Sequence, residues 1–131
     1  MLCENATVAE RIRFYRTKRN LTGNTLAMQI GLSRYAIMNY ENATTEPTLV
    51  DLKKIASALD VNPCMLYDGY YQFLDYPYSM RIKQLRVEHQ LHQRELGAVL
   101  GVNRRAVERW ELGKAVISRA TWEMLVSLKY L

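Results

Sequence analysis

The sequence repeats itself after 70 residues. When the chain is aligned with itself at this shift, nine of the 31 positions from Arg11 to Glu41 carry the same residue. At ordinary amino-acid frequencies, chance would give about two identical positions. The identities are Arg11/Arg81, Ile12/Ile82, Arg16/Arg86, Leu21/Leu91, Leu26/Leu96, Gly31/Gly101, Arg34/Arg104, Ala36/Ala106 and Glu41/Glu111. A chain of 131 residues has room for two small cores, since about 50 to 65 residues can fold alone. The repeat therefore predicts two small domains of the same fold.

The spacing of the apolar residues predicts helices in both copies. Apolar residues recur at intervals of three and four and do not alternate for long, so the expected fold class is all-α. Helices are predicted in the first copy near residues 7–18, 23–30, 34–42, 48–59 and 63–70. Four of them recur in the second copy, near residues 79–88, 93–100, 104–112 and 119–130. The predicted N-caps are Thr22, Ser33 and Thr48, with Asp51 completing a capping box after Thr48.

We expect a first domain at residues 1–70, a connecting segment at 71–78 and a second domain at 79–131. Six aromatic residues lie between Tyr67 and Tyr78, close to this connection. The rings could form a platform on which single-stranded bases stack. We favour the interpretation that they fill the seam between two small domains, because each domain alone is short of core.

Residues 21–41 and 91–111 follow a helix-turn-helix pattern. A very small residue lets the two helices cross closely, a glycine tolerates a left-handed turn, and a capping residue starts the second helix. Two apolar side chains then turn one face of that helix inward and leave its first turn exposed. The paired positions are Ala27/Gly97, Gly31/Gly101, Ser33/Asn103, Ile37/Val107 and Tyr40/Trp110.

At these residues the chain resembles the phage-repressor and Cro-like family of helix-turn-helix proteins, of the xenobiotic-response-element type. The first copy resembles the family over five helices, including the closing segment 47–61. It departs from the family pattern at Gly23, where a phosphate-binding glutamine is frequent, and at Ala43, where glycine is frequent. The second copy keeps Gln93 and Gly113 but lacks the last helix. The resemblance implies two tandem lambda-repressor-like domains, of five and then four helices.

The resemblance also implies that the second helix of each motif enters the major groove, with its exposed early positions facing base edges. In the first copy these positions are Arg34, Tyr35, Met38 and Asn39. In the second copy they are Arg104, Arg105, Glu108 and Arg109. Because arginine can bond O6 and N7 of guanine together, the second copy is expected to favour a guanine-bearing half-site. Phosphate contacts, which set register without reading sequence, are expected from Gln93, Arg94, Asn103 and Ser33.

These assignments have simpler alternatives. The arginines could be solubilising charges, and Glu108 could form a salt bridge within its helix that restrains Arg104 or Arg105. Tyr35 and Met38 are as compatible with a protein contact as with thymine methyl groups. For Glu41 and Glu111, near the ends of the reading helices, we expect an internal salt bridge or a cap rather than catalysis.

Charge favours an acidic partner, and composition argues against several other classes. Residues 1–70 hold 8 basic and 7 acidic side chains and residues 71–131 hold 10 and 6, so most of the net charge of +5 lies in the second copy. No apolar stretch reaches the roughly 18 residues of a membrane span and no signal peptide is recognised, so we expect a cytoplasmic protein. Cys3 and Cys64 form no C-x-x-C pair, and His89 and His92 lack a nearby third ligand, so no disulfide framework and no metal site are predicted. No catalytic constellation or phosphate loop is recognised, and we expect neither an enzyme nor a cofactor.

These observations predict a sequence-specific double-stranded DNA-binding transcriptional regulator of the repressor type. Both copies could straddle one asymmetric site with their reading helices about 34 Å apart, or one copy could read DNA while the other dimerises. The alternative is a protein–protein interaction or antitoxin-like module, with a protein partner on the first copy. Trp122, Met124 and Leu128 of the last helix are expected to be core; if exposed, they would favour a homodimer.

Overall fold

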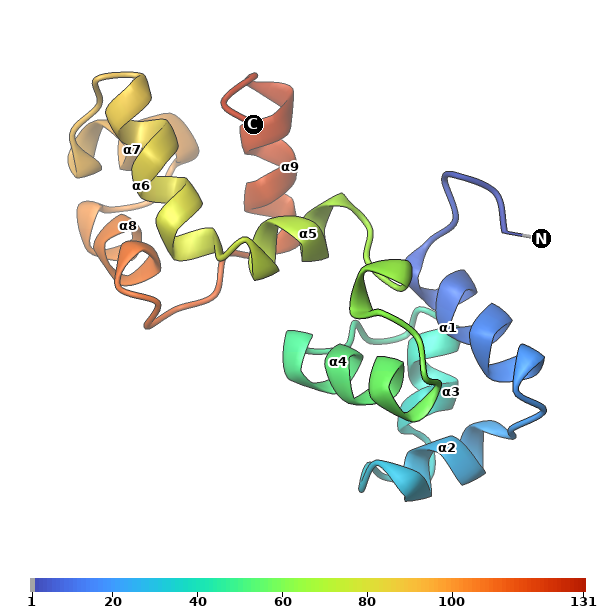
Figure 1. Ribbon diagram of the computed structural model, residues 1–131. Coiled ribbons are helices and arrows are strands. Elements are labelled where there is room, and N and C mark those ends of the chain that lie inside the picture. The colour runs from blue at the N-terminus through green and yellow to red at the C-terminus, as the bar shows by residue number, and fades with distance from the viewer. Residues whose placement is uncertain (1) are drawn as a thin grey trace. The chain divides into compact units, whose positions relative to one another are not determined.

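The computed structural model describes residues 2–131 (Figure 1). These residues form helices, turns and loops without a strand, so the all-α fold class is confirmed. The chain divides into two compact units, which we call unit one, ending at Tyr71, and unit two, from Gln72 to Leu131. No helix within residues 2–131 has the length and apolar character needed to cross a bilayer.

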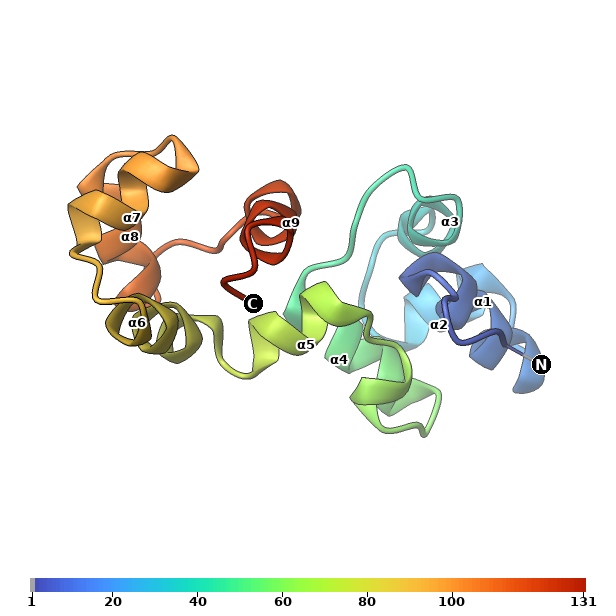
Figure 2. The same ribbon diagram turned by 90° about the horizontal axis from the view of Figure 1, so that it is seen from above.

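Each unit is built on the same order of four helices (Figures 1 and 2). Unit one contains α1 (Val8–Lys18), α2 (Gly23–Gln29), α3 (Ala36–Glu41), α4 (Leu49–Ala58) and the 3-10 helix η1 (Pro63–Met65). The helix α5 (Gly69–Asp75) contains the boundary between the units. Unit two contains α6 (Tyr78–Glu88), α7 (Gln93–Leu100), α8 (Arg104–Glu111) and α9 (Arg119–Ser127). In unit one α3 packs against α1 and α2, and in unit two α8 packs in the same way against α6 and α7.

The two cores use equivalent positions. Four side chains of unit one and their counterparts 70 residues later are all fully buried, and these pairs are Ile12/Ile82, Leu26/Leu96, Ile37/Val107 and Ile55/Leu125. Full burial of an aliphatic side chain of this size contributes about 1.5 to 3 kcal/mol. The hydrophobic positions that carry the sequence repeat are therefore the positions that stabilise each unit.

The turn between the two motif helices forms as predicted in both units. Gly31 has φ +74° and Gly101 has φ +73°, which is the left-handed region that glycine adopts without steric strain. Thr22 and Thr48 cap α2 and α4 through their hydroxyl oxygens. The carboxylate of Asp51 accepts a hydrogen bond from the Tyr40 hydroxyl at 2.9 Å, so it ties α4 to α3 and does not close the predicted capping box.

The single helix predicted at residues 63–70 is wrong. The side chain of Asn62 caps the short 3-10 turn of η1, and the carboxylate of Asp68 then accepts a hydrogen bond from the Tyr71 N–H at 3.2 Å in the first turn of α5. Short polar side chains bond the nearby backbone in this way and compete with a continuous helix. The segment therefore forms two separate elements.

The aromatic residues near the unit boundary are mostly buried. Tyr67, Tyr70, Tyr71 and Phe73 are each less than a tenth exposed, and the Tyr71 hydroxyl donates to the carbonyl of Pro47 at 2.6 Å. Bases stack on exposed ring faces. These four rings are thus not available as a platform for single-stranded nucleic acid.

The last helix is less covered than predicted. Leu125 is fully buried and Trp122 is half-buried, but Met124 and Leu128 are 42% and 48% exposed, so the prediction that both are core is wrong. In unit one, η1 packs against the equivalent helix α4. Part of the apolar surface of α9 is open to solvent.

Candidate nucleic-acid interface

A basic hollow lies at the N-terminal end of α7 in unit two. It has a volume of about 430 Å³ and is lined by Arg86, His92, Gln93, Arg94 and Arg104. Arg86 and Arg104 are paired with Glu111 and Glu108, so the uncompensated positive charge comes from Arg94 and from the partial charge of the helix N-terminus. We call this feature the α7–α8 hollow; its charge suits an anionic ligand such as a phosphate group.

The start of α7 fixes two of the predicted phosphate-binding residues. The carboxylate of Glu95 accepts a hydrogen bond from the His92 N–H at 2.9 Å, which sets the helix start at Gln93. Gln93 and Arg94 are therefore the first two helical residues. Gln93 is half-buried and Arg94 is exposed at the rim of the hollow.

The helix α8 brings the four predicted base-reading residues of unit two onto one short helix. Asn103 caps it by accepting a hydrogen bond from the Ala106 N–H at 2.9 Å, as predicted. The inward positions Val107 and Trp110 are buried. The remaining positions of the helix include three exposed arginines and a half-buried glutamate, namely Arg104, Arg105, Arg109 and Glu108.

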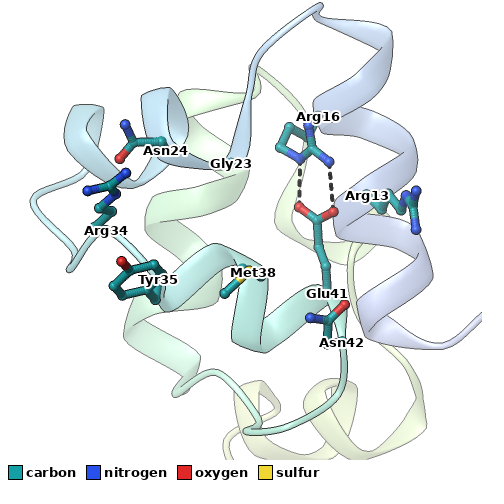
Figure 3. Close-up of a pocket in the computed structure, with 9 residues that line it drawn as sticks. All are labelled: Arg13, Arg16, Gly23, Asn24, Arg34, Tyr35, Met38, Glu41 and Asn42. Carbon is teal, nitrogen blue, oxygen red and sulfur yellow. Dashed lines mark hydrogen bonds and ion pairs between the residues drawn. The ribbon is translucent and has the colours of Figure 1, made fainter.

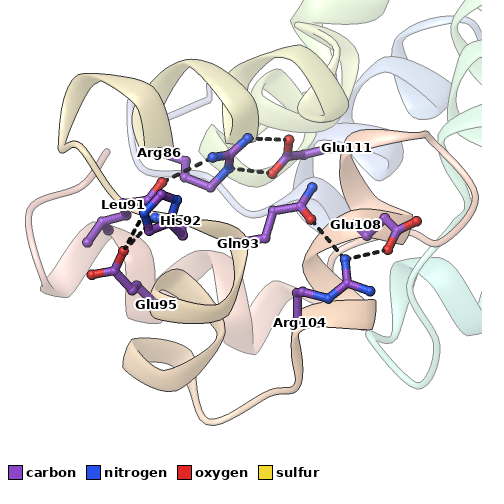
Figure 4. A network of polar contacts seen from close by, with 8 residues as sticks. All are labelled: Arg86, Leu91, His92, Gln93, Glu95, Arg104, Glu108 and Glu111. Carbon is purple, nitrogen blue, oxygen red and sulfur yellow. Dashed lines mark hydrogen bonds and ion pairs between the residues drawn. The ribbon is translucent and has the colours of Figure 1, made fainter.

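Arg104 is held in place by two neighbours (Figure 4). Its Nη1 atom donates to Glu108 Oε2 at 2.8 Å, one turn further along α8, and to Gln93 Oε1 of α7 at 3.3 Å. The expected salt bridge within the helix is therefore present at Arg104. The guanidinium thus lies between a predicted phosphate contact and a predicted base contact.

Unit one has a hollow at the same place in its fold (Figure 3). This α2–α3 hollow has a volume of about 400 Å³, and four of its lining residues lie 70 positions before residues of the α7–α8 hollow: Arg16, Gly23, Asn24 and Arg34. The others are Arg13, Tyr35, Met38, Glu41 and Asn42. The two motifs thus share the site but differ in its side chains.

The second motif helix of unit one starts later than predicted. The helix α3 begins at Ala36 with Tyr35 at the N-cap position and no side-chain cap, so the prediction that Ser33 caps it is wrong. Arg34 and Tyr35 therefore precede the helix, while Met38 and Asn39 lie within it. In unit two a Cβ atom at Gly97 would lie 2.7 Å from the Val102 carbonyl oxygen. Ala27 carries this Cβ atom in unit one, so the carbonyl that follows it must lie further away than the Val102 carbonyl lies from Gly97, although the glycine turn is the same in both units.

Arg34 has a different environment from its counterpart Arg104. Its guanidinium lies over the ring of Tyr35, 5.6 Å from the centroid. Tyr35 and Met38 are 56% and 49% exposed at the edge of the hollow. The surface of unit one therefore combines basic groups with open apolar surface.

In both units an arginine–glutamate ion pair joins the first helix to the second helix of the motif. In unit one Arg16 donates to both carboxylate oxygens of Glu41 at 2.6 and 2.8 Å and to the Leu21 carbonyl at 2.6 Å. In unit two the residues 70 positions later repeat these bonds, from Arg86 to Glu111 at 2.8 and 3.0 Å and to Leu91 at 3.0 Å. The hydrogen bond to its glutamate raises the pKa of each arginine further above its usual range. The prediction of an internal salt bridge at both glutamates is confirmed.

Several lining residues were not found from the sequence. The repeat identified Arg16 and Arg86 without showing that each contacts the glutamate 25 residues later. The arginine and the glutamate are both identical in the two copies, and this identity was the sequence feature that could have indicated the pair. Asn24 could have been found as the counterpart of Arg94, whereas nothing in the sequence marked Arg13 or Asn42.

The two histidines have other neighbours. A ring nitrogen of His89 lies 2.8 Å from the Leu85 carbonyl, and its ring packs edge-on against Tyr130. His92 lines the α7–α8 hollow. Among residues 2–131, no three histidine, cysteine, aspartate or glutamate side chains are grouped so that they could hold a metal ion.

Comparison with known families covers both units. Residues 9–72 match a family model described as a helix-turn-helix domain, and residues 82–128 match a second one described as helix-turn-helix. The chain is a tandem helix-turn-helix protein. Both matches are to helix-turn-helix families, and such families are DNA-binding regulators. No curated protein and no solved structure matches the chain.

Proposed function

We propose that this chain is a sequence-specific double-stranded DNA-binding transcriptional regulator of the repressor type, and that unit two is its principal reader. The observation that carries this proposal is the set of exposed arginines on α8 beside the basic α7–α8 hollow. The helix α8 enters the major groove, and Gln93 and Arg94 bond backbone phosphates beside it. Asn103 keeps the two hydrogens of its amide nitrogen for a further phosphate, because its side-chain oxygen is engaged in the cap.

The residues of α8 determine which bases unit two prefers. Arg104, Arg105 and Arg109 each carry a planar guanidinium that matches the O6 and N7 atoms of guanine. A good bidentate contact of this kind contributes about 1 to 3 kcal/mol of discrimination against other bases. Unit two therefore prefers a half-site that carries guanine.

Unit one is a weaker reader under this proposal. Gly23 supplies no side chain for a phosphate at the position where unit two has Gln93, and Asn24 replaces Arg94. Arg34, Tyr35, Met38 and Asn39 would contact bases with fewer charges than α8 provides. Ser33, exposed before α3, remains a proposed phosphate contact.

A second function for unit one has support of its own. Tyr35 and Met38 are about half exposed and lie together beside the α2–α3 hollow, where they offer apolar contact surface. Such a surface fits a protein partner. Under this alternative unit two reads DNA and unit one binds protein, as in an antitoxin-like module.

The test is selection of binding sites from a random pool of duplexes by the intact protein. The proposal expects an enriched site whose strongest positions are guanines. A long site with two unlike halves indicates that both units read DNA from one chain. A short palindrome indicates one reader per subunit of a dimer, for which the exposed Met124 and Leu128 would supply apolar contact surface.

The salt dependence of binding is the matched control for this selection. Affinity for DNA falls steeply with salt because each phosphate contact releases counterions. The proposal expects a steep slope together with an enriched sequence. Enrichment of no sequence, with only salt-sensitive retention of bulk DNA, would overturn the sequence-specific function.

A further inference from the structure

Of the three α8 arginines proposed to contact bases, Arg104 is the one paired with Glu108. Arg104 donates both of its bonds, to Glu108 at 2.8 Å and to Gln93 at 3.3 Å, from the same nitrogen, Nη1. The Nη2 and Nε atoms point away from these two acceptors (Figure 4), and the described hydrogen bonds of Arg104 leave them unused. Arg105 is exposed on the same helix, and the described contact of Arg109 is a 3.5 Å bond to the Lys114 carbonyl.

Unit one shows what the same arginine does without these acceptors. The counterparts of Gln93 and Glu108 are Gly23 and Met38, and neither offers a side-chain oxygen. Arg34 lies instead over the ring of Tyr35. The two equivalent arginines thus have different partners, Glu108 and Gln93 for Arg104 and the Tyr35 ring for Arg34.

We propose that Glu108 is a positioning residue that determines the base specificity of Arg104. This inference rests on the proposed DNA-binding function. An arginine side chain carries about 2 kcal/mol of rotamer entropy, and fixing it before binding lowers the ordering cost for the one base that its free edge meets. The carboxylate also penalises competing arrangements, because it faces the negatively charged backbone without a partner whenever Arg104 turns to a phosphate.

The experiment compares the intact protein with Arg104→Ala, Glu108→Gln and Glu108→Asp. After the preferred site has been selected, binding is measured for that duplex, for every single-base variant and for a random duplex, at several salt concentrations. Arg104→Ala identifies the base pair that Arg104 reads, as the position where preference disappears. Glu123→Gln on α9 is the matched control, because it removes the same charge from an exposed residue outside the hollow.

We expect Glu108→Gln to lower the preference at the Arg104 base pair by about tenfold, which is near the lower end of the range for one bidentate contact. Binding to the random duplex should tighten by a few-fold, because one negative charge facing DNA is lost. Preferences at the other base pairs should stay as they are. Glu108→Asp, which keeps the charge on a shorter stem, should restore part of the preference, and Glu123→Gln should leave the ratio between sites unchanged.

Two results would overturn this inference alone. One is an unchanged preference at the Arg104 base pair in Glu108→Gln, and the other is an equal loss of affinity on every duplex, which indicates a structural role. If Arg104→Ala alters no base preference, Arg104 is not a reader and the inference also fails. If the unaltered protein selects no sequence at all, the proposed function itself fails, and that result is distinct from the others.

Discussion

The two units are built on the same frame but present different surfaces. The arginine–glutamate pairs, the buried aliphatic positions and the left-handed glycines recur 70 residues apart with nearly the same geometry. On the outer face, unit two has Gln93, Arg94 and Glu108 where unit one has Gly23, Asn24 and Met38. The residues that stabilise the fold, which we call the frame, are thus largely separate from the residues on the outer face. The outer faces of the two units can therefore differ and bind different partners.

The largest expected effect concerns the shared frame. Glu41→Gln and Glu111→Gln each leave a mostly buried guanidinium without its carboxylate, and each should destabilise its own unit by about 3 kcal/mol. Urea denaturation measures the loss, with tryptophan fluorescence reporting unit two and the methyl resonances of Ile12 and Ile37 reporting unit one, because both tryptophans lie in unit two. Glu123→Gln serves as the exposed control. A loss below about 1 kcal/mol in either unit would show that the frames are not equivalent.

The next effect concerns the difference between the surfaces. Arg104→Ala combined with Arg105→Ala should weaken binding to the preferred site by more than about 2 kcal/mol, because both guanidiniums face base edges. Arg34→Ala combined with Asn39→Ala should weaken it less. The measurement is duplex affinity at fixed salt, with Lys129→Ala as a control that removes a charge just after α9. No change with the Arg104 and Arg105 pair means that unit two is not the reader, and no change with the Arg34 and Asn39 pair assigns unit one to a protein partner.

A third effect separates the units at high pH. Burial and the hydrogen bond to Asp51 raise the pKa of Tyr40 to about 12 from an ordinary value of 10.0, and its counterpart Trp110 does not titrate. Since the folded state favours the neutral hydroxyl, this stabilisation is complete below about pH 10 and is lost as the pH rises through about 12. Tyr40→Phe should therefore destabilise unit one by about 1 to 2 kcal/mol at pH 8.

The difference between Tyr40→Phe and the unaltered protein should shrink as the pH is raised. Urea denaturation of unit one, followed by the Ile37 methyl resonances at a series of pH values, measures it. Tyr78→Phe in unit two is the control, because burial alone raises the pKa of Tyr78. A difference that stays constant up to about pH 11.5 would contradict the assignment.

The smallest effect concerns the residue that follows the second motif helix. Ala43 has φ +58° where Gly113 has φ +71°, and a left-handed conformation costs a residue with a Cβ atom about 1 kcal/mol. Ala43→Gly should stabilise unit one and Gly113→Ala should destabilise unit two, each by about 1 kcal/mol. No atom would crowd a Cβ at Gly113, so its substitution tests backbone strain alone. Thermal unfolding with the unit-specific probes measures both, and shifts of the same sign would contradict the comparison.

The sequence predicted the parts of the fold that depend on local patterns. Apolar spacing located the helices to within a few residues, and the motif glycines fall in the left-handed region as expected. The prediction failed where short polar side chains compete with a helix, as at Asn62 and Asp68, and at the start of α3, where unit one has Ala27 in place of Gly97. The helix propensity of a residue does not specify where the carbonyl oxygen of the following turn will lie.

The candidate site was predicted as a set of residues but not as a network. The exposed positions of α8 follow from helical periodicity, because Val107 and Trp110 must point inward. The bond from Arg104 to Gln93 joins residues of two different helices, so no spacing within one helix predicts it. The salt bridge from Arg104 to Glu108 was one of several pairings that the sequence allowed, and the structure selects it.

By itself, the sequence determined that this protein has two all-helical units with a common motif, because hydrophobic periodicity, glycine and capping residues act over a few residues. The tertiary structure decided which acidic group each arginine meets: Arg16 and Arg86 face glutamates 25 residues away, and Arg104 is shared between two helices. It also decided which apolar side chains remain exposed, as at Tyr35 and Met124. Both outcomes depend on how helices pack against one another, and the free energy of that packing comes from residues that are distant along the chain.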